Sequence, residues 1–250
     1  MHNPVNCCVI IPVFDHEHAI AAVVDAVLRH QLPCILVDDG SSAPCADRLT
    51  ALALAAPEQI SLVRLQENQG KGAAVIAGFK AACDKGYTHA LQIDADGQHA
   101  TDDIPRFIQV ATVHPRAIVT GQPVFDDSIP AIRFYSRYLT HVFVWLNTLS
   151  FDIRDSMCGF RLYPLDRVMA LLAHQRIGRR MNFDTDILVR LHWQGVQVIN
   201  LPTRVTYPAD GVSHFRLWFD NLLITRMHCQ HLIGMVLRLP LLLTRKLTKR

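Results

Sequence analysis

Short apolar runs alternate with segments of helical spacing through residues 7–93. Residues 7–13 and 34–37 are continuous apolar runs, as expected of parallel strands that are buried on both faces. Residues 60–65 and 89–93 are predicted to be further strands, with an Ala-rich helix over 73–83 between them. Strands that alternate with helices form an open α/β sheet, in which ligands bind beyond the carboxyl ends of the strands. We therefore expect an α/β domain whose functional residues follow its strands.

The segment 91–99, LQIDADGQH, places two carboxylates at the end of the fourth strand. Alternate residues of a strand point the same way, so Asp94 and Asp96 can project on one side, and Gly97 allows a sharp turn. With the Gln98 amide they offer hard oxygen donors, which suit Mg²⁺ or Mn²⁺ with positions left for phosphate oxygens. We expect Asp94, Asp96 and Gln98 to be the metal ligands.

A surface turn at residues 94–99 would also favour Asp and Gly. An EF-hand loop is excluded because His99 stands where that pattern needs Gly, and a phosphatase nucleophile is disfavoured because such motifs follow the first strand of their fold. Asp38 and Asp39 end the second strand, and strand ends of an open sheet share one crevice, which favours a nucleotide site over a simple turn. The turn 68–72, NQGKG, could add N–H groups for a phosphate, unless Gly72 serves only close helix packing.

Five segments resemble, in order, the successive blocks of inverting glycosyltransferase family 2: IPVFDHEHAI, VDDGSS, NQGKGAA, LQIDADGQH and RDSMCGFRLYP. The resemblance covers roughly residues 7–207 and is greatest to the dolichyl- or polyprenyl-phosphate mannosyl- and glucosyltransferase branch. It implies a GT-A fold, which is a Rossmann-like, mostly parallel sheet flanked by helices. It also implies a UDP- or GDP-linked sugar as donor and Mg²⁺ or Mn²⁺ as cofactor. By this resemblance Asp39 holds the uracil or ribose side, while Asp94, Asp96 and Gln98 gather the metal and the diphosphate.

The predicted donor site departs from the family pattern at two places. Asp15-His16 stands where the family usually has Asn-Glu, and residues 121–123 read Gly-Gln-Pro where many members read Gly-Ser-Arg. Both departures concern the donor and leave the metal ligands in place. The predicted donor-binding residues are Pro12, Phe14, Asp15, Asp38, Asp39, Lys71, Asp94 and Ala95.

A predicted helix over residues 132–150 carries Arg133, Arg137 and His141 on one face, since they stand at i, i+4 and i+8. A solvated basic stripe would have the same spacing. The resemblance implies instead that arginines at this place hold the acceptor phosphate, and the planar guanidinium suits that group. Arg133 and Arg137 are therefore the predicted acceptor-binding residues.

Three further carboxylates are candidates for the base that a hydroxyl acceptor would need. Asp155 lies in residues 154–164 and is expected to act as a base or to hold a positive group, although a turn acid is an alternative. Asp184 and Asp186 open a predicted helix over 182–193, where carboxylates also favour the helix dipole. The resemblance places an acidic residue there that faces the acceptor, and Asp184 fits it best. The predicted catalytic residues are Asp96, Asp155 and Asp184.

The second half of the chain completes the predicted sheet. A helix over residues 102–113 and a fifth strand over 117–120 follow the metal motif. Two closing strands, 196–200 and 203–207, flank Pro202. We therefore place the glycosyltransferase domain at residues 1–209.

Residues 210–250 have a different character. Trp218 and Phe219 begin a series of apolar residues at helical spacing, residues 232–243 are strongly apolar, and basic residues close the chain. No run reaches the roughly 18–20 apolar residues that span a bilayer. An apolar helical face followed by basic residues is typical of a segment that lies on an anionic membrane. A helix packed on the domain is the alternative.

Composition limits the function classes further. Half of the residues are hydrophobic and 19% are charged, which is enough apolar material for a large core. The formal net charge of +3 argues against a nucleic-acid partner. Seven Cys without CxxC spacing indicate reduced, mostly buried thiols, and the N-terminus does not resemble a signal peptide. We expect a cytoplasmic protein at the inner face of the membrane.

These patterns together predict a metal-dependent inverting glycosyltransferase that moves a sugar from a nucleotide diphosphate sugar to a lipid-type acceptor, preferably a polyprenyl phosphate. Transfer to a lipid or saccharide hydroxyl is the alternative within this class. A catalytically silent nucleotide-sugar-binding protein is disfavoured, because it need not retain the DADGQH motif. A nucleotidyltransferase is disfavoured because PVFDHEHAI, rather than a Gly-rich basic loop, follows the first strand.

Overall fold

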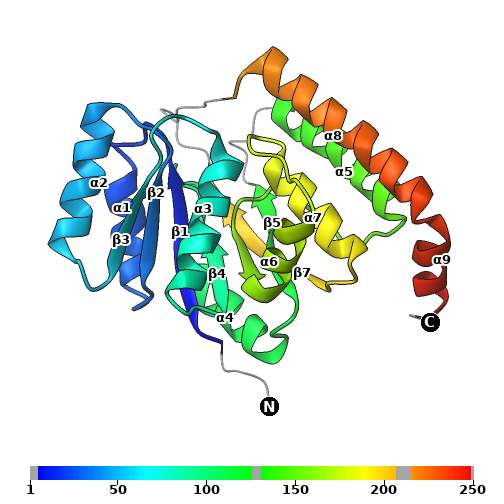
Figure 1. The fold of residues 1–250 in the computed structure, drawn as a ribbon, viewed down its shortest axis with the longest axis horizontal. Helices are drawn as coiled ribbons and strands as arrows, with labels where there is room; N and C mark the ends of the chain where they lie inside the picture. Colours follow the sequence, from blue (N-terminus) through cyan, green and yellow to red (C-terminus); the bar gives the residue numbers. More distant parts are fainter. Residues whose placement is uncertain (1–4, 126–130, 207–214, 249–250) are drawn as a thin grey trace.

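A seven-stranded sheet forms the centre of the protein (Figure 1). The computed structural model describes residues 5–125, 131–206 and 215–248, without the side chains of 125, 131–136 and 248. The strand order is β3-β2-β1-β4-β6-β5-β7, and among the described strands only β6 runs antiparallel to its neighbours. The strands are β1 (Cys7–Val13), β2 (Cys34–Asp38), β3 (Ile60–Arg64), β4 (His89–Gln92), β5 (Ile118–Phe125), β6 (Arg161–Pro164) and β7 (Val198–Val205). The predicted mostly parallel α/β sheet is confirmed.

Helices cover both faces of the sheet, as the unbroken apolar run of β1 predicts. Successive residues of a strand point to opposite faces. Cys8 and Ile10 accordingly pack with residues of α3, α6 and α7, whereas Cys7 and Val9 pack with residues of α1, α2 and α4. The helices of these two layers are α1 (Ile20–Leu28), α2 (Ala43–Ala55), α3 (Lys71–Asp84), α4 (Ile104–Val113), α6 (Leu165–His174) and α7 (Phe183–Trp193), with a 3₁₀ turn over Thr101–Asp103.

The strands near the edge differ from the predicted ones. β5 continues to Phe125, and one strand, β7, runs through Pro202 where two were expected. Pro202 pairs with Gln122 of β5, and β7 is the last strand of the sheet. A proline lacks the N–H group, which an edge strand does not need on its outer side. The short helix α6, which follows β6 directly, was not predicted.

Two C-terminal helices, α8 (Leu217–Leu237) and α9 (Leu239–Thr248), lie along one side of the domain (Figure 1). α8 packs beside α5 (Ala131–Thr148), and His231 of α8 places Nε2 2.7 Å from Oδ1 of Asp186 in α7. Arg245 of α9 donates from Nη1 to the Trp193 carbonyl at 2.7 Å. These contacts attach both helices to the domain. The predicted boundary at residues 209–210 falls outside the described residues.

The length and apolarity of these helices bear on the membrane prediction. Within the described ranges, no helix is long and apolar enough to cross a bilayer. α8 ends at Leu237, Arg238 stands between the two helices, and Pro240 is the second residue of α9. Contact of the two helices with a membrane surface remains a prediction.

Candidate functional site

The antiparallel pairing of β4 with β6 brings two motifs that are distant in the sequence together. Gln92, the last residue of β4, pairs with Arg161, the first residue of β6. The chain that follows β4 and the chain that precedes β6 therefore leave the sheet side by side. A small open pocket lies between them at the end of the sheet. Its lining consists of Asp94, Asp96, Gln98, His99, Pro123, Arg137, Met157, Cys158, Gly159 and Val205.

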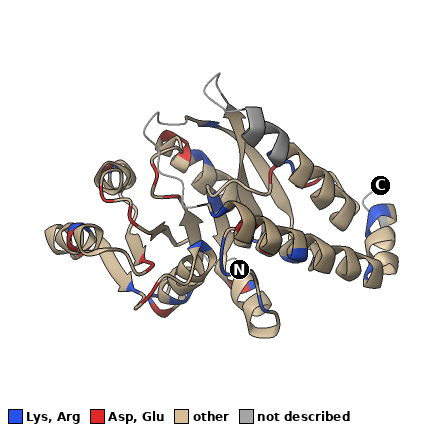
Figure 2. Ribbon diagram, turned by 90° about the horizontal axis from the view of Figure 1, so that it is seen from above, with Lys and Arg blue, Asp and Glu red and all other residues tan. Residues whose placement is uncertain are grey.

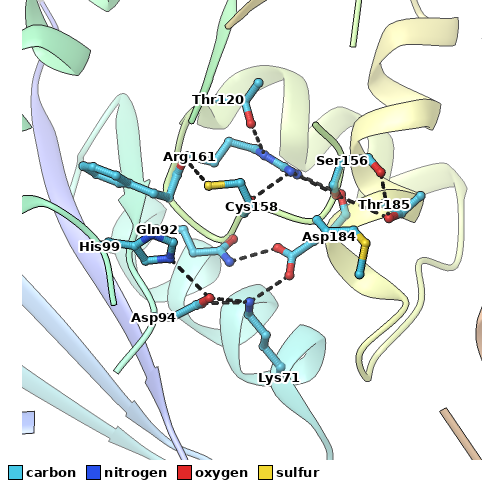
Figure 3. A network of polar contacts seen from close by, with 12 residues as sticks. Lys71, Gln92, Asp94, His99, Thr120, Ser156, Cys158, Arg161, Asp184 and Thr185 are labelled. Atoms are coloured by element: carbon cyan, nitrogen blue, oxygen red, sulfur yellow. Dashed lines mark hydrogen bonds and ion pairs between the residues drawn. The ribbon is translucent and has the colours of Figure 1, made fainter. Parts of the chain in front are cut away.

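Asp94 is the most tightly held of the predicted metal ligands. The Lys71 ammonium lies 2.7 Å from its Oδ1 and 2.9 Å from its Oδ2, and His99 Nε2 lies 3.5 Å from Oδ2 (Figure 3). Burial alone would raise the pKa of Asp94, but Lys71 and His99 outweigh it and hold the pKa well below its usual range. The Asp94 carboxylate is therefore ionised.

Lys71 has a second carboxylate partner, Asp184 in the first turn of α7. Its ammonium lies 2.8 Å from Oδ2 of Asp184, and Gln92 Nε2 donates to Oδ1 of Asp184 at 3.0 Å (Figure 3). Burial would lower the pKa of Lys71, but the charges of Asp184 and Asp94 raise it above its ordinary value. α3 and α7 can come this close only because residue 72 is a glycine: a Cβ there would overlap Phe183 of α7. Gly72 thus has a close-packing role that brings the start of α3 to the start of α7.

Asp96 and Gln98 lie on the turn that follows Asp94. Asp96 Oδ1 accepts the Gln98 N–H at 3.1 Å, and Gly97 adopts φ +74°, a conformation that glycine accepts without strain. The three predicted ligands line one pocket and present carboxylate and amide oxygens, a donor set that fits Mg²⁺ or Mn²⁺. No group of three or more His, Cys, Asp or Glu among the described residues could hold a metal ion. The Gln98 amide and oxygens of a bound diphosphate would have to complete the coordination.

Asp39, expected on the base or ribose side of the donor, shapes the glycine-rich turn before α3. Its carboxylate accepts the N–H groups of Gln69 and Gly70, each at 2.8 Å, and the Asn68 amide at 3.1 Å. Burial raises the pKa of Asp39, while these N–H groups and Arg180 act in the opposite direction. Contact of Asp39 with a nucleotide stays a prediction.

The other predicted donor-binding residues lie at the ends of β1, β2 and β4. Asp38 accepts from Arg64 Nε at 2.8 Å, and Asp15 accepts from the Ser42 N–H at 2.8 Å. Both carboxylates therefore hold neighbouring loops together in the described structure. Pro12 is buried in β1, Phe14 follows β1 directly, and Ala95 is buried between the two carboxylates of the metal motif.

Arg137 and Asp155, predicted as acceptor-binding and catalytic residues, form an ion pair in which Arg137 lines the pocket and Asp155 is buried behind it. Arg137 Nη2 donates to Asp155 Oδ1 at 2.8 Å and its Nε donates to Oδ2, while His141 Nε2 lies 3.2 Å from Oδ2. Burial would raise the pKa of Asp155, but Arg137 and His141 hold it well below its usual range. Asp155 is thus an ionised carboxylate that holds two basic side chains. Arg133 lies in α5, and its side chain is outside the described part of the structure.

Arg161 is a buried cation for which the sequence patterns predicted no role. It is fully buried, yet all five of its N–H groups have oxygen acceptors. The acceptors are Thr120 Oγ1, Tyr163 Oη, and the carbonyl oxygens of Asp184, Ser156 and Cys158. An arginine between Phe160 and Leu162, at the start of a buried strand, was the available signal, because a buried guanidinium must satisfy its donors.

Comparisons with known proteins show which proteins this chain is similar to. Polyprenol monophosphomannose synthase of Mycolicibacterium smegmatis is 25% identical over 219 residues, 82% of this chain and 79% of that protein. Undecaprenyl-phosphate 4-deoxy-4-formamido-L-arabinose transferase of Pectobacterium carotovorum is 34% identical over 178 residues, which are 68% of this chain and 53% of that enzyme. The chain thus spans about half the length of the second relative.

A solved structure shares the fold, and a family model matches most of the sheet. Glucosyl-3-phosphoglycerate synthase from Mycobacterium tuberculosis, in complex with Mn²⁺, UDP-glucose and phosphoglyceric acid, superposes with a TM-score of 0.61 at 15% identity, covering 92% of this chain and 79% of that one. The fold is the GT-A fold that the sequence predicts. The model for glycosyl transferase family 2 matches residues 8–169, from β1 through the pocket to α6. The chain belongs to glycosyl transferase family 2, and the protein is a glycosyltransferase.

Proposed function

We propose that this glycosyltransferase moves one sugar from a nucleotide diphosphate sugar to a polyprenyl-type lipid phosphate, with inversion at the anomeric carbon. The observation that carries the proposal is that Asp94, Asp96, Gln98 and Arg137 all line the same pocket. Such a pocket would bring a metal-bound diphosphate and an acceptor anion together. The names of relatives support the acceptor class, since they act on polyprenol, dolichyl phosphate and undecaprenyl phosphate.

The donor side of the proposal rests on the metal motif. Asp94, Asp96 and Gln98 would hold Mg²⁺ or Mn²⁺, which when bound neutralises charge on the leaving diphosphate. The same fold binds Mn²⁺ and UDP-glucose in the mycobacterial synthase. Lys71, at the first residue of α3, lies beside Asp94 and adds a positive charge at that edge of the pocket. Assays with both UDP- and GDP-sugars would identify the nucleotide of the donor.

The acceptor side favours a phosphate over a hydroxyl. A phosphate oxygen is already anionic and needs no general base, whereas a hydroxyl does. The two carboxylates that the sequence predicts as candidate bases are already engaged, Asp155 with Arg137 and His141, and Asp184 with Lys71. Arg137, whose Nε and Nη2 pair with Asp155, lines the pocket and places a positive charge there, which suits a phosphate.

We also propose that α5, α8 and α9 contact the membrane in which a lipid acceptor is anchored. Apolar side chains are exposed along all three helices, among them Leu139 and Leu146 of α5 and Trp218 and Leu222 of α8. Along the described residues of these helices the sole acidic residue is the buried Asp220, whereas Lys and Arg are present (Figure 2). An apolar face with basic residues fits an anionic lipid surface. A cytoplasmic location at the inner face of that membrane follows from the same proposal.

The proposal is tested by transfer assays with matched acceptors. Purified protein and Mn²⁺ or Mg²⁺ would be incubated with UDP- and GDP-sugars and vesicles that contain undecaprenyl phosphate, and nucleoside diphosphate release and lipid-linked sugar measured. Vesicles with undecaprenol, which has the same chain and a hydroxyl, are the control, together with water-soluble 3-phosphoglycerate. Product with undecaprenyl phosphate alone is expected. Product with undecaprenol or 3-phosphoglycerate, and none with the lipid phosphate, would overturn the proposed acceptor.

A further inference from the structure

We infer that Asp184 is a positioning residue that acts through Lys71, sharing the lysine ammonium with Asp94, and that it is not a base for the acceptor. The inference rests on the proposed function, because it assigns the donor diphosphate to the Asp94 side of the pocket. It concerns a residue that the sequence pattern placed at the acceptor. The geometry around its two carboxylate oxygens points the other way.

Both oxygens of Asp184 already have partners within the protein. Oδ2 lies 2.8 Å from the Lys71 ammonium, and Oδ1 accepts from Gln92 Nε2 at 3.0 Å. The Asp184 side chain is only 8% exposed, and Gln92 is fully buried. Each oxygen of Asp184 thus already accepts from a donor of the protein.

A network behind Asp184 fixes the direction in which it points (Figure 3). Tyr163 Oη donates to Gln92 Oε1 at 3.3 Å, so the Gln92 amide must turn its Nε2 donor toward Asp184. Arg161 Nη1 donates to Tyr163 Oη at 3.1 Å and to the Asp184 carbonyl at 2.8 Å. The side chain and the main chain of Asp184 are thus held by one buried cation.

The same network determines where the Lys71 charge stands. Its ammonium is shared between Asp184 on α7 and Asp94 at the end of β4, which Gly159 and His99 also contact. Without the Asp184 charge, Lys71 would pair with Asp94 alone. That ammonium, which already contacts both Asp94 oxygens, would then compete more strongly with a divalent cation for the Asp94 carboxylate. Asp184 should therefore strengthen binding of a metal–nucleotide complex, although it is not among the predicted metal ligands or the predicted donor-binding residues.

A double-mutant cycle separates action through Lys71 from direct action on the acceptor. The variants are Lys71→Met, Asp184→Asn and the double variant, and calorimetry would measure the affinity of each for UDP and for GDP with Mn²⁺. We expect each single change to weaken binding of the preferred nucleotide by about tenfold, and the double variant to be no weaker than Lys71→Met. Independent effects that multiply in the double variant would overturn the inference. So would an Asp184→Asn protein that binds nucleotide normally and loses only kcat/KM for the lipid acceptor.

A milder variant keeps the test decisive if a charge change prevents folding. Tyr163→Phe removes only the hydroxyl that orients Gln92, and it retains every charge and the ring that packs on Phe79. It should weaken nucleotide binding a few-fold in the wild-type background and not at all beside Lys71→Met. Unchanged nucleotide affinity in folded Tyr163→Phe would contradict the inference. Nucleotide binding needs no acceptor. The affinities of these variants for nucleotide therefore test the role of Asp184 even if the acceptor is not a lipid phosphate.

Discussion

Gly159 packs directly against the carboxylate of Asp94, so closely that a Cβ at position 159 would overlap both carboxylate oxygens. The contact joins the segment before β6 to the metal motif after β4. Gly159→Ala should therefore push Asp94 out of its place between Lys71 and His99 while leaving the sheet intact. We expect transfer to fall by about 10²-fold, the usual cost of losing a charge-stabilising group. The measurement is kcat/KM at saturating Mn²⁺ beside the thermal unfolding midpoint.

Gly86 provides the contrasting control for that substitution. A Cβ there would meet no atom within 4 Å, but the residue adopts φ +79°, which disfavours alanine. Gly86→Ala should cost about 1 kcal/mol of stability and leave transfer unchanged. If both glycine variants lose activity in proportion to their stability, the contact between Gly159 and Asp94 has no specific role.

Asp96→Ala should abolish transfer without unfolding the protein. Asp96 lies on a partly exposed turn, and its described contact is with the N–H of Gln98. Removal of a metal ligand should reduce the rate by about 10² or more even at high Mn²⁺. Retention of more than about a tenth of the wild-type rate would show that Asp96 is not a metal ligand.

Arg137→Ala tests the acceptor site. Loss of the guanidinium should raise KM or lower kcat/KM for undecaprenyl phosphate by about tenfold, because a charge-assisted hydrogen bond contributes roughly 1.5–3 kcal/mol. It also leaves Asp155 with His141 and two backbone N–H groups, so stability should be measured alongside. Affinity for the donor nucleotide should hardly change. An equal loss of nucleotide affinity would assign Arg137 to the diphosphate instead.

The proposed membrane face can be tested with single charges. Trp218 is 86% exposed and Leu222 is 67% exposed on α8, and Leu54 on α2 is 75% exposed away from the three helices. Trp218→Asp and Leu222→Asp should reduce sedimentation with anionic liposomes at low salt, whereas Leu54→Asp should not. Wild-type protein that stays in the supernatant, or three variants that behave alike, would contradict a membrane role for this face.

His228 gives a pH dependence of stability. It is buried beside His231 in α8, and burial, followed by the neighbouring His231, lowers the pKa of His228 from 6.5 to about 4. Between these pH values the unfolded chain binds a proton that the folded protein does not, so stability falls as the pH drops through this window. Through His228, lowering the pH from 7 to 5 should reduce the free energy of unfolding by roughly 1–2 kcal/mol. His228→Asn should remove that part of the slope in denaturant titrations, and an unchanged slope would refute the assignment.

The sequence alone was enough to predict the sheet and the metal motif, because both depend on local patterns. The run of β1 is apolar at every position, and a run of that kind is buried on both faces wherever it occurs. Asp94 and Asp96 follow a strand and precede a glycine, so their place at the strand end did not depend on distant residues. Family membership follows from the same blocks, since they occur in the family order.

Only the tertiary structure decided which charges meet. Lys71, Asp94 and Asp184 lie on three different elements, and they come together through the pairing of β4 with β6 and the packing of Gly72 on Phe183. A spacing rule predicts which residues share a helix face, and it correctly grouped Arg137 with His141, but it does not show that Asp155 lies opposite them. Pairings of this kind depend on strand register and on the docking of helices, which single-chain periodicity does not contain. Local pattern therefore determined the elements and the motifs, and long-range packing determined the partners of each charged side chain.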